Sequence, residues 1–515
     1  MTARTVAVIG GGLAGITAAV ALREAGLGVT LLEARPWLGG ATCSFSRGGL
    51  VIDNGQHVFL RCCTAYQELL ARLGMTGSAA IQERFDVTVL SGSGRDTGGP
   101  GDHAGIGGTA GGAGTWSGPG RARLRRTALP GPLHMGKALA GYSFLAPSER
   151  LRVIRGALAM RFADPAAAEL DSQRLGDWLA ARGQSEQARR RLWDLFIVSA
   201  LNINGDDAST ALAATVIKMA LLGGRAAADI GVPAVPLGEL HGAAAASLLG
   251  RLGADVRLGR KVTAVEPVPA GGFRVLITSP TTDTGADDAG TPSRLADGGP
   301  PGSIDGGVIS ADAVVLAVPH GPAARLVPAG AASGSARWAD LGSSPIVNVH
   351  VIYDRRVTRL PLVAAIGSPV QWVFDKTRPA GVQAGQYLAV SVSAADSYID
   401  VPVARLRELF LPALEELFPA ARDARVTDFF VTRERQATFR QGPGCGSLRP
   451  GAATSVPGLA LAGAWTNTGW PDTMEGAVRS GHSAAQELIS QLTALSAPQQ
   501  AVPAAAAQPA ARVSS

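Results

Sequence analysis

Residues 5–33 read TVAVIGGGLAGITAAVALREAGLGVTLLE, and this stretch decides the fold class. Its apolar run 5–9 predicts a buried strand, its alanine-rich stretch 16–25 predicts a helix, and its second apolar run 29–32 predicts another strand. A strand, a helix and a strand in this order form a βαβ unit, in which the two strands lie parallel in one sheet. We therefore expect an α/β protein built on a Rossmann-like domain.

The turn between the first strand and the helix carries a GxGxxG pattern, and the second strand ends on an acid, Glu33. In this pattern Gly10 permits the tight turn, Gly12 lets backbone N–H groups approach a pyrophosphate, and Gly15 allows close packing of helix on strand. Glu33 is placed to accept hydrogen bonds from adenosine ribose hydroxyls. The unit predicts a dinucleotide cofactor, which the helix N-terminus also contacts through Leu13 and Ala14.

Composition sets limits on the class of protein. The chain has 515 residues, of which 46% are apolar, so a large core and more than one domain are expected and a disordered chain is excluded. The net charge is +6, the difference between 47 basic and 41 acidic residues. This balance is compatible with an acidic ligand, an anionic membrane surface or nucleic acid. The basic stretches lack interleaved aromatic residues, so no nucleic-acid partner is expected.

Cysteine usage and hydropathy suggest where the protein works. The four cysteines form neither a CxxC pair nor a metal-ligand spacing, so we expect reduced thiols, no metal site and a cytoplasmic location. No uninterrupted apolar run reaches 18 residues, so no transmembrane helix is expected.

The residues after Glu33 distinguish between nicotinamide and flavin cofactors. Residues 33–40, EARPWLGG, lead into a second glycine turn, and this pattern resembles the FAD-binding glutathione-reductase and amine-oxidase superfamily. Residues 53–57, DNGQH, resemble the superfamily's stretch where backbone passes close to the isoalloxazine ring. The superfamily usually has Arg after the glycine pair; here Ala41 stands there, and Arg35 is the alternative source of that phosphate contact. The resemblance implies FAD as cofactor, with contacts at Ala34, Arg35, Gly39, Gly40, Asn54, Gly55 and Gln56.

Residues 457–487, PGLALAGAWTNTGWPDTMEGAVRSGHSAAQE, resemble the closing FAD motif of the same superfamily. A short strand is followed by a polar turn and by a helix that begins near Thr473, whose N-terminal dipole would favour negative charge on the flavin pyrimidine. The superfamily commonly has an acid after the strand-end glycine, whereas this chain has Ala464, so Thr466 or Asn467 would replace that contact. The implied FAD contacts are Gly463, Ala464, Thr473, Met474, Glu475 and Ala477, with the backbone of Val262 at the adenine.

Within the superfamily the chain is similar to the hydroxysqualene dehydroxylase family in several blocks that occur in the same order. The blocks are DNGQH at 53–57, VSALN at 198–202, LLGGRAAADIGVPAVPLGEL at 221–240, PIVNVHVIYDR at 345–355, SPVQWVFD at 368–375 and TGWPDTMEGAVRSG at 468–481. The resemblance implies reductive removal of the hydroxyl of hydroxysqualene to give squalene for hopanoid biosynthesis. It also implies a long apolar isoprenoid substrate, an external electron donor for FAD and an upstream synthase of the squalene pathway.

The implied reaction needs an acid that helps the hydroxyl to leave as water, before a flavin hydride reaches the allylic cation. The candidate acids lie in motifs expected near the ring: Asp53, His57, Asp472 and Glu475. His57 is equally compatible with a purely structural role. Three other functions stay open: a carotenoid or polyene desaturase or isomerase, an amine oxidase, and a non-catalytic prenyl-binding escort.

We expect a Rossmann-like FAD-binding domain of the glutathione-reductase and amine-oxidase type together with a discontinuous mixed α+β substrate domain. The FAD-binding domain takes 1–84, 236–334 and 431–495, with flexible inserts at 91–128 and 279–307, the substrate domain takes 129–235 and 335–430, and 496–515 form a disordered tail. The first insert is inferred from residues 92–120, which hold 13 glycines in 29 positions. Alternating residues of the second substrate segment either line an apolar tunnel or pack the sheet: Asn348, His350, Tyr353, Gln371 and Trp372.

Residues 134–163 combine apolar residues at helical spacing with several arginines. Two interpretations stay open: a core-facing helical pair with a solvated basic face, and an interfacial helix that holds the protein peripherally on the cytoplasmic face of a membrane. Two further basic stretches, 121–126 and 189–191, are expected to be surface or lipid-facing charge.

Overall fold

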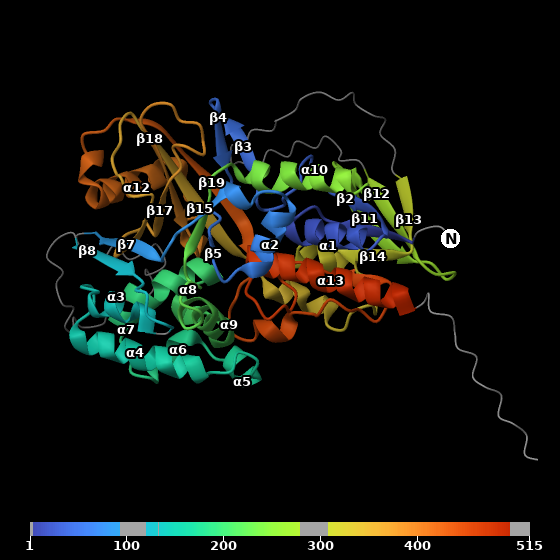
Figure 1. Ribbon diagram of the computed structural model, residues 1–515, viewed down its shortest axis with the longest axis horizontal. Helices are drawn as coiled ribbons and strands as arrows, with labels where there is room; N and C mark the ends of the chain where they lie inside the picture. The colour runs from blue at the N-terminus through green and yellow to red at the C-terminus, as the bar shows by residue number, and fades with distance from the viewer. Residues whose placement is uncertain (1–3, 93–119, 132, 279–306, 495–515) are drawn as a thin grey trace, which may run out of the picture.

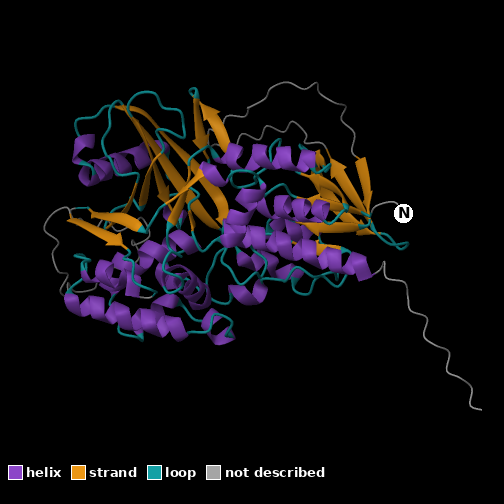
Figure 2. Ribbon diagram, in the orientation of Figure 1, coloured by secondary structure: helices purple, strands orange, loops and turns teal. Residues whose placement is uncertain are grey.

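The computed structural model describes residues 4–92, 120–131, 133–278 and 307–494. Strands gather in two main places, a parallel sheet with helices packed on it and a larger mixed sheet, and a layer of helices lies beside the larger sheet (Figure 2). Figure 1 shows that both ends of the chain contribute to the parallel-sheet side, because α1 and α13 lie together there. The predicted tail 496–515 lies outside the described residues.

The parallel sheet has five strands in the order β10-β2-β1-β14-β20, and every neighbouring pair is parallel. Its strands are β1 (Thr5–Ile9), β2 (Gly28–Leu32), β10 (Asp255–Arg257), β14 (Ala313–Leu316) and β20 (Leu459–Leu461). The sheet is buried on both faces, because Val6 and Val8 pack into the core shared with α1 (Leu13–Glu24) and α13 (Met474–Ala494), while Ala7 and Ile9 pack toward a second, three-stranded sheet. Such two-sided burial explains the continuous apolar runs, and the α/β prediction is confirmed.

The three-stranded sheet is antiparallel and consists of β11 (Lys261–Pro267), β12 (Phe273–Thr278) and β13 (Gly307–Ala311). Strands β12 and β13 pair as neighbours on either side of the second insert, and the insert itself lies largely outside the described residues. Residues 307–316 form two strands that belong to different sheets, because the chain passes from β13 into β14 at Asp312. The Asp312 carboxylate accepts a hydrogen bond of 2.7 Å from Thr5 N at this crossing.

The larger sheet has seven strands in the order β19-β15-β18-β17-β16-β7-β8. Its strands are β7 (Asp86–Ser91), β8 (Gly120–Arg125), β15 (Ser344–Tyr353), β16 (Leu362–Ile366), β17 (Trp372–Asp375), β18 (Gln386–Val392) and β19 (Val426–Thr438). Helix α12 (Val403–Leu417) packs on one face, against Val347, Val349 and Val351. The described strands therefore form a mixed α+β substrate region.

Two predicted boundaries are wrong here. Residues 120–125 were assigned to a flexible insert, but they form β8, because Ala122 and Leu124 are buried in alternation with exposed arginines. The glycines next to this segment hid its period-2 pattern, and residues 93–119 lie outside the described part of the chain. Strand β19 also continues to Thr438, eight residues beyond the boundary predicted at 430, because it pairs with β15 over that length.

Short elements connect the two sides of the molecule. They are the hairpin β3 (Ser44–Arg47) and β4 (Leu50–Asp53), the small sheet β5 (Phe59–Leu60), β9 (Ile230–Pro233) and β6 (Ala79–Ile81), and the helices α2 (Thr64–Arg72), α10 (Ala244–Arg251) and α11 (His320–Leu326). The helical layer contains α3 (Gly136–Ala140), α4 (Pro147–Phe162), α5 (Ala168–Asp171), α6 (Leu175–Ala180), α7 (Glu186–Ala188), α8 (Asp194–Leu201) and α9 (Thr210–Val216). None of the four cysteines forms a disulfide.

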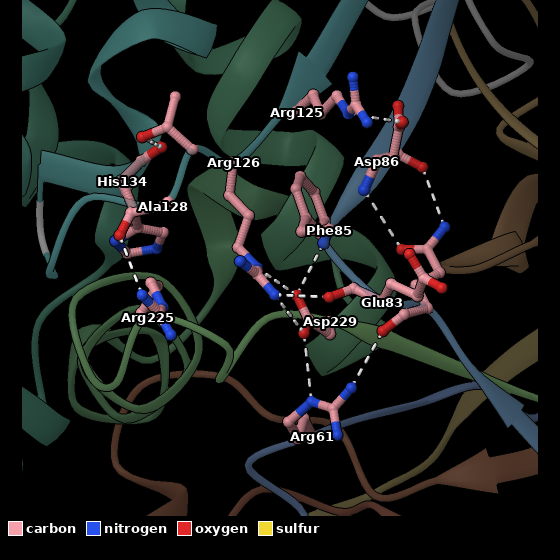
Figure 3. Close-up of polar contacts among 12 residues, drawn as sticks. Arg61, Glu83, Phe85, Asp86, Arg125, Arg126, Ala128, His134, Arg225 and Asp229 are labelled. Carbon is pink, nitrogen blue, oxygen red and sulfur yellow. Dashed lines mark hydrogen bonds and ion pairs between the residues drawn. The ribbon is translucent and has the colours of Figure 1, made fainter.

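A buried carboxylate ties these regions together (Figure 3). Asp229, whose side chain is fully buried, accepts bonds from Arg126 at 2.6 Å, from Arg61 at 3.1 Å and from Phe85 N at 2.7 Å. Part of the basic stretch 121–126 is therefore neutralised internally rather than surface or lipid-facing charge. Asp86 likewise pairs with arginines of β8.

Candidate functional site

The first glycine turn has one open position between two crowded ones. A Cβ on Gly10 would lie 2.4 Å from Ala317 O, and a Cβ on Gly15 would lie 1.8 Å from Gly10 O, so both positions require glycine. A Cβ on Gly12 would meet nothing closer than Gly40 Cα at 3.9 Å. Helix α1 begins after Gly12 and has no side-chain cap, so its first-turn N–H groups are available to an anionic ligand.

The second glycine turn lies directly against the first. Gly39 N donates to Gly11 O at 2.8 Å, and a Cβ on Gly40 would lie 2.9 Å from Gly12 Cα. Arg35 Nη1 donates to Gly40 O at 3.1 Å, so its guanidinium is held beside the open position at Gly12. The arrangement fits a pyrophosphate between a helix N-terminus and an arginine, with exposed Ala34 and Ala41 at its rim.

Glu33 and Val262 lie at one end of this turn pair. The Glu33 carboxylate accepts hydrogen bonds from Gly11 N at 2.6 Å and from Arg35 N at 2.8 Å. A carboxylate offers about four acceptor sites, so capacity for ribose hydroxyls remains. Arg260 N donates to Glu33 O at 2.8 Å, which brings the start of β11, with Val262 and the bulge after it, alongside Glu33. This is the adenosine end of a dinucleotide site.

Asp53, the first residue of the DNGQH stretch, is a buried and paired carboxylate. Its Oδ2 lies 2.8 Å from Lys376 Nζ, and Oδ1 accepts hydrogen bonds from Ser44 Oγ at 2.7 Å and from Leu237 N at 2.9 Å. Lys376 belongs to the larger sheet's side, so this ion pair joins the two halves of the molecule. Both oxygens of Asp53 are engaged by a cation and two hydrogen-bond donors within the protein, which counts against Asp53 as the proton donor.

The next four residues form the floor of a polar niche. Asn54 O accepts bonds of 3.1 Å from both Asn348 Nδ2 and Thr432 Oγ1. A Cβ on Gly55 would lie 3.3 Å from His57 Nε2 and 3.6 Å from Asn348 Nδ2, so glycine leaves room there for these two side chains.

Two buried polar atoms in this niche, Asn348 Oδ1 and Gln56 Nε2, have no partner among the described residues. Such orphaned groups are expected where a polar ligand supplies the missing bonds, and they fit the heteroatom edge of an isoalloxazine ring. Burial lowers the pKa of His57 to about 4, so its imidazole is neutral at pH 7. His57 therefore donates no acidic proton at that pH.

Neighbouring residues of the substrate sheet divide between its two faces. His350 accepts or donates toward Tyr387 Oη at 2.6 Å and Thr432 Oγ1 at 3.0 Å and stacks on Phe430, so it packs the sheet. Tyr353 points to the opposite face from Asn348, because their separation is odd. The five residues predicted to alternate along one surface therefore do not share one. Gln371 bonds to the backbone of residue 393, and Trp372 donates to Ser199.

The closing motif lies at the carboxyl edge of the parallel sheet. Gly463 follows β20 with a φ of +134°, and its N donates to Ser480 Oγ at 2.8 Å. Ala464 and the loop after it are held by Arg449, which donates to Ala464 O at 3.1 Å, Thr466 O at 2.6 Å and Trp470 O at 2.7 Å. Sequence reasoning missed Arg449, whose only signal was its place directly before a proline ahead of the motif. Whether Thr466 or Asn467 replaces the missing acid stays a prediction.

The start of α13 holds the last candidates. Thr473 Oγ1 accepts from Gly476 N at 3.2 Å and Thr473 O from Ala477 N at 2.9 Å, so this turn, with Met474, initiates the helix. The fully buried Glu475 carboxylate accepts from Ala65 N and Tyr66 N at the start of α2 and from Arg479 at 2.8 Å. Glu475 therefore caps α2 and pairs with Arg479 in this structure, which counts against Glu475 as the proton donor.

Asp472 differs from the other three candidates. Its Oδ2 accepts one bond, of 2.9 Å, from Phe439 N, and no described residue bonds to Oδ1. Desolvation raises the pKa of this half-buried carboxyl to about 6, although the Phe439 bond and nearby Arg449 oppose the shift. Asp472 is the candidate that carries a proton for an appreciable fraction of the time near neutral pH.

A parallel sheet with an uncapped glycine turn, a ribose acid, a second glycine turn and a polar niche beyond them defines an FAD-dependent oxidoreductase. The residues fit FAD, because Gly12 leaves an open position at a helix N-terminus for a pyrophosphate, and Asn348 and Gln56 have buried polar atoms without described partners that a flavin ring would satisfy. A model of the family described as flavin containing amine oxidoreductase matches residues 13–489. The chain belongs to that family, and FAD is its cofactor.

Relatives cover nearly the whole chain. A hydroxysqualene dehydroxylase of Rhodopseudomonas palustris is 29% identical over 490 residues, which are 94% of this chain and 98% of the relative. A zeta-carotene desaturase of Synechocystis is 25% identical over 512 residues, or 94% and 97%. The crystal structure of putrescine oxidase bound to putrescine superimposes with a TM-score of 0.66 at 19% identity and covers 95% of this chain and 99% of its own, which shows the shared fold.

Proposed function

We propose that this oxidoreductase removes the hydroxyl group of hydroxysqualene reductively and so forms squalene for hopanoid synthesis. The similarity to hydroxysqualene dehydroxylases over nearly the full chain supports this substrate. The observation that carries the chemistry is Asp472, a carboxyl with a raised pKa and one oxygen to which no described residue donates a hydrogen bond. Loss of a hydroxyl group requires such a proton donor, because hydroxide is a poor leaving group.

Bound FAD, once reduced by an external donor, supplies the hydride that replaces the hydroxyl. Asp472 donates its proton to the substrate oxygen, the C–O bond breaks with its electron pair on oxygen, and water leaves. The resulting allylic cation takes up the hydride, so the net change is exchange of hydroxyl for hydrogen. Asp53 lies in the stretch below the niche, where it pairs with Lys376.

Asn348 and Gln56 orient the cofactor in this proposal. Their unpartnered Oδ1 and Nε2 atoms supply one acceptor and one donor, and Asn348 is itself fixed by its bond to Asn54 O. The substrate is a long apolar isoprenoid, delivered by an upstream synthase that forms a C30 allylic alcohol. The electron donor in this proposal is external to the enzyme, either a small soluble reductant or another protein.

The test is anaerobic mixing of photoreduced enzyme with hydroxysqualene, followed by flavin absorbance and product identity. We expect reoxidation of the flavin with formation of squalene. Asp472→Asn should slow reoxidation by about 10²- to 10⁴-fold, the usual contribution of general acid catalysis. Asp472→Glu should restore part of the rate, and Asp396→Asn, a change at an exposed acid, should have no effect.

Each alternative function has its own outcome. Desaturation of a carotenoid precursor without reaction of hydroxysqualene would favour the zeta-carotene desaturase relatives, and peroxide release from an amine would indicate an amine oxidase. A colourless protein that takes up no FAD would indicate an escort. Squalene formation at an unchanged rate in Asp472→Asn would refute the role of Asp472 and leave the reaction in place.

A further inference from the structure

Helix α4 carries apolar side chains on two opposite faces. The inner face buries Val153, Gly156 and Met160 against the helical layer. The outer face presents four large apolar side chains to solvent, with exposed fractions of 61%, 42%, 43% and 82%, respectively: Leu151, Ile154, Leu158 and Phe162. Spacings of three, four and four residues place them in one row along the helix, which we call the α4 stripe.

The rotation of α4 about its own axis is fixed by its inner face. A Cβ on Gly156 would lie 2.9 Å from the Gln184 side chain and 3.2 Å from Trp193, so no larger residue fits where the helix is seated. Gln184 donates to Arg152 O at 2.7 Å and accepts from Trp193 at 3.1 Å, which ties the contact to the α4 backbone. The α4 stripe therefore cannot turn inward to be buried.

Helix α4 lies on an outer edge of the molecule (Figure 1). Apolar exposure continues on both neighbours, at Leu133 beside α3 (61% exposed) and at Met219 (42% exposed). Lys218, adjacent to Met219, donates to Ala163 O at 2.8 Å just beyond the end of α4, so this segment lies next to the stripe.

Charge on α4 is strongly one-sided. The helix contains four arginines and a single acid, Glu149, which is mostly buried and pairs with Arg152. On a helical projection Arg155 borders the stripe on one side and Arg161 on the other. Both are exposed, and neither hydrogen-bonds nor ion-pairs with another described residue. An apolar row edged by free guanidinium groups is complementary to acyl chains beneath anionic headgroups.

We propose that α4 docks the protein on an anionic lipid bilayer, with the α4 stripe entering the acyl boundary and Arg155 and Arg161 binding headgroup phosphates. A second copy fits this face poorly, because α4 packed against α4 would bring the two sets of arginines together. Among the described residues no helix is long and apolar enough to cross a bilayer, so the docked helix lies in the plane of the interface. The inference does not depend on the substrate proposed above.

The test is flotation of the FAD-loaded full chain with vesicles of phosphatidylcholine alone or with 30% phosphatidylglycerol. We expect the wild type to float with the anionic vesicles. Leu158→Ser with Phe162→Ser should lower the partition coefficient at least 30-fold, because two apolar side chains no longer leave water. The control Val403→Ser, at an apolar position of α12 whose exposed fraction of 40% is close to the 43% of Leu158, should leave the partition coefficient unchanged.

A second pair of variants isolates the charge. Arg155→Gln with Arg161→Gln should lower binding to anionic vesicles by about 10- to 30-fold, since each basic residue near such a surface contributes about one factor of five. Arg356→Gln with Arg359→Gln makes the same change in net charge elsewhere on the surface and should have little effect.

Flavin content and circular dichroism establish that each variant is folded, which is expected because the stripe is exposed. The proposal is overturned if the wild type does not float, or if the control variants lose binding as much as the α4 pairs. It is also overturned if the wild type is a dimer that the Leu158/Phe162 pair converts to a monomer. Turnover of hydroxysqualene plays no part in this readout.

Discussion

Substitution of Gly12 by alanine should remove FAD binding while leaving the fold intact. The φ and ψ at Gly12, −75° and 179°, are ordinary extended values that alanine adopts. The new methyl would meet no protein atom closer than 3.9 Å, so it occupies the space through which a pyrophosphate reaches the α1 N-terminus. The substitution should therefore weaken FAD binding without disturbing the packing of the protein.

The expected size follows from that geometry. In the apoprotein, replacement of glycine by alanine at the N-cap costs about 1 kcal/mol, because alanine is the poorer N-cap residue. Losing close approach to the helix N-terminus should raise the FAD dissociation constant at least 100-fold, or about 2.7 kcal/mol. At an FAD concentration of about 100 times the wild-type dissociation constant, the wild type gains about 2.7 kcal/mol of stability and the variant about 0.4 kcal/mol.

Two further glycine variants serve as controls, one that should disrupt packing and one that lies in open space. Gly15→Ala places a Cβ 1.8 Å from Gly10 O, so backbone must move by more than 1 Å to reach 3.0 Å, and apoprotein stability should fall by about 3 kcal/mol. Gly250→Ala, in α10 with open space around it, should stabilise by about 0.5–1 kcal/mol through higher helix propensity.

Urea unfolding of apoprotein and holoprotein, with FAD titration by fluorescence quenching, gives both quantities. Wild-type FAD affinity in Gly12→Ala would refute the assignment of the pyrophosphate to this turn. Loss of apoprotein stability by several kcal/mol in the same variant would refute the claim that the position is open.

Three further predictions concern stability. Lys376→Met should lower the free energy of unfolding in urea by about 3–5 kcal/mol, because it leaves the buried Asp53 carboxylate without its cation. Combining it with Asp53→Asn should recover part of this loss. If the losses of the two single variants simply add in the double variant, the pairing is contradicted. Ala394→Gly should stabilise the protein by about 1 kcal/mol, because Ala394 has a φ of +51°, a left-handed conformation that is strained for alanine and not for glycine. The control Ala395→Gly should destabilise the protein. Equal effects of the two variants in thermal melts would contradict the strain at Ala394. Burial raises the folded-state pKa of Asp194 to about 7, so between about pH 4 and 7 the native state binds more protons than the unfolded state and the free energy of unfolding falls as pH rises. Asp194→Asn should flatten the dependence of the unfolding free energy on pH in this range. An unchanged slope would exclude Asp194 as the source of this dependence.

The parts of the site that could be predicted are those set by local spacing. Gly10, Gly12 and Gly15 lie within one turn, and their roles follow from which of them faces backbone and which faces open space. Strands β1 and β2 were predictable for a similar reason, because a strand that is buried on both faces has apolar residues at consecutive positions.

Contacts between distant residues were not predictable from the residue pattern. Asp53 pairs with Lys376, more than 300 positions away, and Glu475 caps a helix that begins 411 positions earlier in the chain. Neither partner has a sequence signal, since an acid near a flavin motif suggests a proton donor as readily as a structural ion. Only burial and partners separate Asp472 from the other three acids.

The bond pair on Asn54 O has a consequence for how relatives of this chain can differ in length. Asn348 and Thr432 lie opposite each other in the ladder of β15 and β19, and both donate to that single carbonyl. Deletion or insertion of one residue inside either strand would turn its donor to the other face of the sheet. Changes in the loops that join the strands leave this alignment untouched. Homologous chains should therefore vary freely in the length of those connections and keep the number of residues within each strand constant. The lengths of the two strands thus fix the positions of both donors in the cofactor niche.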